Sequence, residues 1–129
     1  MNPSNNTPLE GTKLANFTPV DSVPELRIID VQEGTGDVVP EGATITAHYT
    51  GALCQDGTIF QSSHDFGDAI TFPLSGVIAG WTKGVPGMKV GGVRRLVIPA
   101  DLAYGSHSPA PNIPANSDLV FDIELVAIN

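Results

Sequence analysis

The chain has 129 residues, the length of one typical domain, and a chain of this size can form a core without disulfides or metals. Its 14 acidic and 6 basic residues give a formal charge of −8 at pH 7. An acidic surface repels phosphate groups, so we expect neither nucleic acid nor a membrane as a partner. Glycine and proline number 14 and 11, which disfavours a helical bundle and favours short strands joined by many turns.

Two further features of the composition limit the class of protein. Cys54 is the only cysteine, which excludes an intramolecular disulfide and a cysteine-rich zinc site. The longest unbroken apolar run is Leu125–Ile128, far shorter than the roughly 20 residues of a membrane-spanning helix or the about 7–15 of a signal-peptide core. We therefore expect a soluble, cytoplasmic protein that is a monomer.

The first 24 residues differ in composition from the rest of the chain. They are rich in Asn, Pro, Ser, Thr and Gly and show no apolar period. This composition predicts a flexible N-terminal tail over residues 1–24. The pattern changes at Glu25, and residues 25–129 are predicted to form one globular domain.

The globular part begins with two predicted strands. Leu26–Val31 is rich in β-branched residues and ends at the turn cluster Glu33–Asp37. Further on, apolar Ile45, Ala47 and Tyr49 alternate with polar residues. This period of two is typical of a strand with one buried face.

The remaining strands are short and are separated by turn residues. Gln55-Asp56-Gly57 is a hairpin signal, and Thr58–Phe60 is the predicted return strand. Ile70–Phe72 and Val93–Ile98 are two further predicted strands. Leu119–Leu125 alternates apolar and acidic residues, which predicts a final strand with one face on the core and one in water.

One short helix is predicted between these strands. Ile78, Trp81 and Val85 fall at positions i, i+3 and i+7, Ser75 is expected to cap the helix, and Pro86-Gly87 ends it. Two helical turns are not stable alone in water, so the helix must pack on the apolar face of the strands. The predicted fold class is α+β, a curled antiparallel β-sheet wrapped around one short α-helix.

Familiar catalytic and metal-binding motifs are incomplete in this chain. The glycine-rich stretch Gly84–Gly92 lacks the Lys-Ser/Thr pair of a phosphate loop. His48, His64 and His107 are too widely spaced for a local zinc motif. Ser62–Asp65 holds the residue types of a catalytic triad without the surrounding G-x-S-x-G turn, so a capped loop is expected. The aromatic residues at strand and helix positions either fill the core or line a pocket for a small ligand or peptide.

Seven short motifs are spread along the chain between about Leu26 and Ile128. In order, the motifs are His48–Gly51, Asp56–Ser63, Val77–Trp81, Met88–Gly92, Ala103–Gly105, Ile113-Pro114 and Leu119–Asp122. Their order and spacing resemble those of the FKBP-type peptidyl-prolyl cis-trans isomerases. The resemblance implies a curled antiparallel sheet on a short helix and an enzyme that accelerates X-Pro bond rotation during protein folding.

The resemblance also implies a binding pocket. Trp81 would form its floor, and the backbone N–H of Ile78 and the hydroxyl of Tyr104 would hold substrate carbonyl groups. Gln61 would lie at the pocket edge, where the family usually has Asp, and Ile70 stands where it often has Phe. The walls would come from Tyr49, Phe60, Phe121, Val77 and Ile113, with Ile70 and Phe72 as further ligand-binding residues.

The implied chemistry breaks no bond, so it implies no nucleophile, no metal and no cofactor. Rotation about the X–Pro bond costs about 18–20 kcal/mol because amide resonance is lost. An apolar pocket with aimed donors can lower that barrier by favouring the twisted amide. The implied partners are proline-containing polypeptides and macrolides of the FK506/rapamycin type. The alternative is a proline-motif or macrolide-binding chaperone module with little turnover, and the replacement of the family Asp by Gln61 keeps this alternative open.

Overall fold

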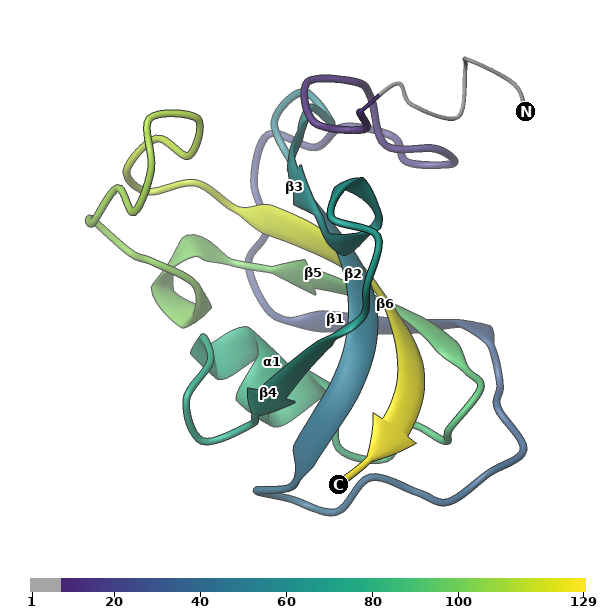
Figure 1. The fold of residues 1–129 in the computed structure, drawn as a ribbon. Coiled ribbons are helices and arrows are strands. Elements are labelled where there is room, and N and C mark those ends of the chain that lie inside the picture. The colour runs from purple at the N-terminus through teal and green to yellow at the C-terminus, as the bar shows by residue number, and fades with distance from the viewer. Residues whose placement is uncertain (1–7) are drawn as a thin grey trace, which may run out of the picture.

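The fold was examined in a computed structural model, which describes residues 8–129 (Figure 1). Its regular elements are six strands, one α-helix and two short 3₁₀ helices, η2 and η3. In chain order they are β1 (Arg27–Gln32), β2 (Thr44–Leu53), β3 (Ile59–Ser62), η2 (Ser63–Asp65), β4 (Ile70–Pro73), α1 (Ala79–Gly84), β5 (Val93–Ile98), η3 (Ala100–Leu102) and β6 (Leu119–Ile128). No helix within the described residues is long and apolar enough to cross a membrane.

The strands form one antiparallel sheet in the order β1-β5-β6-β2-β3, and β4 also pairs with β2. The ten-residue strands β2 and β6 run side by side through its middle (Figure 1). Their register shifts at Thr46 and Ala47, which pair with Ala127 and Leu125, so Val126 lies in a bulge. The α+β prediction of a curled antiparallel sheet with a short helix is confirmed.

The predicted one-sided pattern of the last strand accounts for the main core. Leu119, Phe121, Ile123 and Leu125 of β6 are each at most 4% exposed, and all belong to the cluster that packs between the sheet and α1. Glu124 between them is exposed. The alternation along this strand therefore predicted correctly which side chains face the core.

The helix is shorter than predicted, and the predicted Ser75 cap is wrong. The N-cap residue is Ile78, which makes no side-chain capping bond. Ser75 instead lies in a tight turn, where the Gly76 N–H donates to the Pro73 carbonyl at 2.9 Å. The chain cannot enter the helix until this turn is complete, so the helix begins later than a local capping signal indicates.

Tertiary contacts hold this short helix in place. A Cβ atom at Gly80 would lie 2.6 Å from Ile98, and one at Gly84 would lie 2.7 Å from Leu96. Two glycines on one helix face thus allow α1 to approach β5 more closely than any larger residue would. The position of α1, and of Trp81 within it, is set by this contact rather than by helix propensity.

The N-terminal segment packs on the opposite face of the sheet from α1. Leu14 and Val23 are only 8% and 6% exposed, and they form a second apolar cluster with residues that include Cys54, Val97 and Val120. The outer edge of β3 is also covered, as the hydrogen bonds of residues 11–14 show. Residues 9–23 thus make the contacts of a packed segment, which the composition of residues 1–24 did not indicate. Residues 1–7 of the predicted tail lie outside the described residues.

Candidate active site

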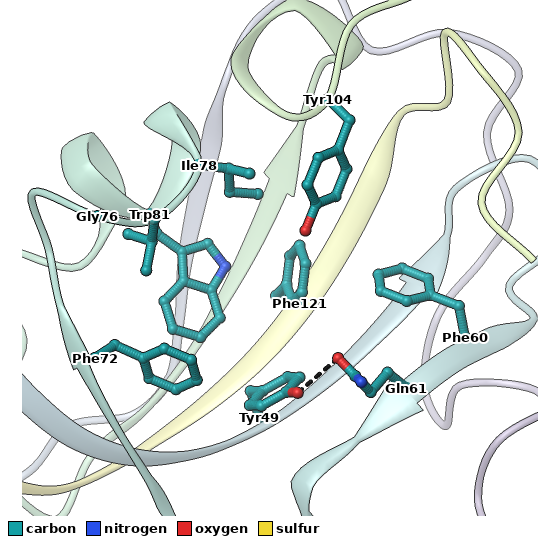
Figure 2. Close-up of a pocket in the computed structure, with 10 residues that line it drawn as sticks. Tyr49, Phe60, Gln61, Phe72, Gly76, Ile78, Trp81, Tyr104 and Phe121 are labelled. Carbon is teal, nitrogen blue, oxygen red and sulfur yellow. Dashed lines mark hydrogen bonds between the residues drawn. The ribbon is translucent and has the colours of Figure 1, made fainter. Parts of the chain in front are cut away.

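A cavity of about 280 Å³ opens beside the helix, at the end of the sheet where β2, β3 and β6 meet. The residues that line it come from β2, β3, β4, β6, α1 with the segment before it, and the turn after η3. They are Tyr49, Phe60, Gln61, Phe72, Gly76, Val77, Ile78, Trp81, Tyr104 and Phe121 (Figure 2).

Trp81 lies at the bottom of the cavity and is 4% exposed. Three aromatic rings surround it in edge-to-face contact, with centroid distances of 5.8 Å to Tyr49, 5.1 Å to Phe72 and 5.4 Å to Phe121. Its Nε1 is buried and has no hydrogen-bond partner among residues 8–129. The floor is therefore the aromatic surface of the indole with one unpaired N–H donor, and edge-to-face packing holds the indole in one orientation.

Gly51 of β2 brings two of the cavity's aromatic rings close together. A Cβ atom at this position would lie 2.6 Å from Cζ of Phe60 and 2.7 Å from Cε2 of Phe121. The two rings meet edge to face at 5.7 Å between centroids. The glycine in the His48–Gly51 motif thus gives these rings their space, because any side chain would displace them.

Besides the Trp81 indole, the polar side chains of the cavity are two phenols and an amide. The Tyr49 hydroxyl donates to Oε1 of Gln61 at 2.7 Å, and the Tyr104 hydroxyl points into the cavity (Figure 2). Burial raises the pKa of Tyr104, and burial, followed by the nearby Tyr104, raises the pKa of Tyr49. Both phenols therefore remain protonated at physiological pH and keep their O–H donors.

The structure brings together most of the site residues predicted from sequence. Nine of them line the cavity: Tyr49, Phe60, Gln61, Phe72, Val77, Ile78, Trp81, Tyr104 and Phe121. Ile113 lines an adjoining hollow instead, and Ile70 packs against the core from β4 without lining either space. Gly76, which does line the cavity, was missed. It has no side chain to suggest a role, and its position directly before Val77 was the only available signal.

The Ser62–Asp65 segment is a capped loop, as predicted. The His64 N–H donates to Oγ of Ser62 at 3.2 Å and caps η2. Ser63 is fully buried, and its Oγ accepts from the Tyr49 N–H at 2.8 Å and bonds Nδ1 of His48 at 2.9 Å. A hydroxyl so enclosed cannot attack a substrate. Within the described part of the chain, no three His, Cys, Asp or Glu residues lie close enough to hold a metal ion.

Comparison with known proteins identifies the family. Residues 36–126 match the sequence model of the family described as "FKBP-type peptidyl-prolyl cis-trans isomerase". The chain belongs to this family. The match confirms the family that the motifs implied.

Individual members of the FKBP family are similar over most of the chain. FkpA of Aeromonas hydrophila is 52% identical over 95 residues, which are 74% of this chain and 35% of that protein. The FK506-binding protein of Neisseria meningitidis serogroup B is 44% identical over 80% of this chain and 95% of its own length. The chain thus spans about a third of one relative and nearly all of the other.

A solved FKBP-type structure confirms the fold at moderate sequence identity. The crystal structure of FkpA from Escherichia coli matches with a TM-score of 0.74 and 38% identity, over 91% of this chain and 53% of that chain. The match confirms that the chain has the fold of this FKBP-type structure.

Proposed function

We propose that the chain accelerates cis–trans rotation about X-Pro bonds in proline-containing polypeptides, with the proline ring bound in the aromatic cavity. The observation that carries the proposal is the cavity itself, which combines an aromatic floor with the Tyr104 hydroxyl as a donor. Its volume of about 280 Å³ is close to the lower end of the roughly 300–1,000 Å³ usual for small-ligand sites.

The aromatic floor acts on the ground state of the reaction. A planar X–Pro amide is strongly dipolar, whereas the twisted amide has lost resonance and is less so. We propose that the proline ring packs on Trp81, with Tyr49 and Phe121 excluding water around it. Loss of water then disfavours the planar amide more than the twisted one, which lowers the barrier between them.

Two donors are available to hold substrate carbonyl groups. One is the neutral hydroxyl of Tyr104. The other is the N–H of Ile78: as the N-cap residue, Ile78 accepts with its carbonyl from the N–H groups of Trp81 and Thr82, while its own N–H precedes the helix. Two donors aimed at fixed points can hold one carbonyl while the bond beside it rotates.

These modest interactions are sufficient for catalysis of this reaction. The uncatalysed step takes tens to hundreds of seconds, so a turnover near 100 per second requires a barrier lower by roughly 5 kcal/mol. A neutral hydrogen bond contributes about 0.5–1.5 kcal/mol, and desolvation and shape supply the remainder. Neither a nucleophile nor a metal is required, because no covalent bond is broken.

We propose further that macrolides of the FK506/rapamycin type bind in the same cavity. The Neisseria relative, which covers nearly the same length, is named an FK506-binding protein. A macrolide of this type should therefore compete with peptide substrates, since both require Trp81 and its neighbouring rings.

A protease-coupled assay on short X-Pro-Phe peptides tests the activity directly. Wild type should accelerate isomerisation, and a saturating macrolide should abolish the acceleration. Tyr104→Phe should lower kcat/KM because it removes one donor and leaves the ring in place. Macrolide binding without acceleration of any peptide would contradict the proposal and favour the alternative, a binding module with little turnover.

A further inference from the structure

A second hollow of about 380 Å³ adjoins the aromatic cavity. The two spaces share Phe60, Gln61 and Tyr104 as a common wall. A polypeptide that leaves the cavity across these three residues would place the side chains beside its proline in the hollow. Successive residues of an extended chain advance by about 3.3–3.6 Å, so residues within two positions of the proline are the ones concerned.

The hollow lies between two segments that are distant in sequence. One side is formed by the loop before β6, including Pro109 and Asn112, and Nδ2 of Asn112 donates to the Phe60 carbonyl at 2.9 Å. The other side is formed by Glu10 of the N-terminal segment. Among the described residues that line the hollow, Glu10 alone is charged.

Hydrogen bonds on both sides of Glu10 fix its backbone. The N–H groups of Leu9 and Glu10 donate to the two carboxylate oxygens of Asp65, at 2.8 and 3.1 Å. Directly after Glu10, the Gly11 N–H donates to the carbonyl of Ile59 in β3 at 2.8 Å. The segment therefore pairs with the start of β3 at its outer edge (Figure 1).

The carboxylate of Glu10 is not used in a salt bridge with any residue from 8 to 129. The nearest basic residue along the chain, Lys13, donates its Nζ to Oγ1 of Thr58 at 2.8 Å. The Asp65 carboxylate beside the Glu10 backbone adds further negative charge. Among the described residues, Glu10 therefore supplies the charge in the lining of the hollow, with the Asp65 carboxylate beside its backbone.

We propose that Glu10 is a specificity-determining residue, which favours substrates with Lys or Arg within two residues of the proline. The proposal rests on the isomerase function proposed above. A cationic substrate side chain in the hollow would approach the exposed Glu10 carboxylate, where a single ion pair changes kcat/KM by about two- to fivefold. Gln61 and Asn112 contribute uncharged walls and so do not repel a cation.

The experiment compares kcat/KM for peptides that differ at one residue, which is Lys, Gln or Glu, placed in turn at each of the two positions before and the two positions after proline. The readout is the ratio of the Lys peptide to the Gln peptide. Glu10→Gln should reduce this ratio to about one. Glu10→Lys should reduce it below one and make the Glu peptide a better substrate than the Gln peptide. The matched control is Glu41→Gln, which removes the same charge from an exposed turn outside both spaces and should leave the ratio unchanged.

Salt provides a second readout that a structural role of Glu10 would not produce. The preference for Lys should fall as ionic strength rises from about 0.01 to 0.5 M, because the Debye length shrinks from roughly 30 Å to less than 10 Å. A wild-type ratio near one on both sides of proline, or a ratio equal in wild type and Glu10→Gln, would overturn the assignment while leaving the isomerase function intact. Absence of acceleration for every peptide would overturn the proposed function and this proposal with it.

Discussion

Replacing Gln61 by an acid should raise kcat/KM. In the structure the Tyr49 hydroxyl donates to Gln61 Oε1 at 2.7 Å, which is the contact that an acid at this position would make with a charged oxygen. A carboxylate strengthens this bond and holds the Tyr49 ring more firmly beside the bound proline. The change therefore tests whether the strength of this bond contributes to catalysis.

The expected size follows from the two kinds of hydrogen bond. A bond to a charged group contributes about 1.5–3 kcal/mol, and a neutral one about 0.5–1.5. Because Gln61 is exposed, water reduces the gain to about 1 kcal/mol, which corresponds to roughly fivefold in rate if it is expressed fully in the transition state. Gln61→Asp shortens the side chain by one methylene, whereas Gln61→Glu keeps its length and so preserves the 2.7 Å geometry.

The assay is kcat/KM on one peptide for wild type, Gln61→Asp, Gln61→Glu and Gln61→Ala, with melting temperatures for all. Gln55→Glu adds the same charge at the exposed hairpin outside the cavity and controls for the net charge of −8. If both acids are equally folded and no faster than wild type, the charge argument fails. If Gln61→Ala also equals wild type, the hydrogen bond to Tyr49 has no part in catalysis.

Three further predictions concern single residues. Trp81 is the only tryptophan, so intrinsic fluorescence should change on macrolide titration, and Trp81→Ala should cost about 3–5 kcal/mol in a denaturant titration; a signal indifferent to saturating ligand would contradict its place in the pocket. Burial, assisted by Asp118, raises the Cys54 pKa to about 12, so the free energy of unfolding should be constant below pH 9 and fall towards pH 12 as the unfolded thiol ionises. Cys54→Ser should reduce this fall and keep isomerase activity within a few-fold of wild type. A hundredfold loss of activity in the folded variant would make the thiol functional. Leu14→Ala should cost about 2–3 kcal/mol of unfolding free energy, against about 0.5 or less for exposed Leu9→Ala; equal melting temperatures for wild type and a variant lacking residues 1–22 would instead support the flexible-tail prediction.

The order of elements and the inner face of the sheet followed from local patterns. The alternation in Leu119–Leu125 identified the core side chains of β6, and Gln55-Asp56-Gly57 identified the hairpin between β2 and β3, where Gly57 has a φ of +77°. Such signals are reliable because a strand's side-chain period and a turn's backbone angles depend on adjacent residues only. The cavity residues were predicted through motifs rather than periodicity, since no local rule connects Tyr49 with Trp81.

Tertiary structure alone decided where the remaining segments lie. Leu14 and Val23 show no periodicity, yet they are buried because the second face of the sheet presents apolar side chains such as Val120 that water would otherwise contact. The same docking places Glu10 in the lining of the hollow beside the aromatic cavity, together with Phe60, a residue about fifty positions away in sequence. Sequence by itself determined the strands, the turns and the family. The N-terminal contacts depend on the shape and exposed apolar area of a distant surface, and that surface exists only once the sheet has formed.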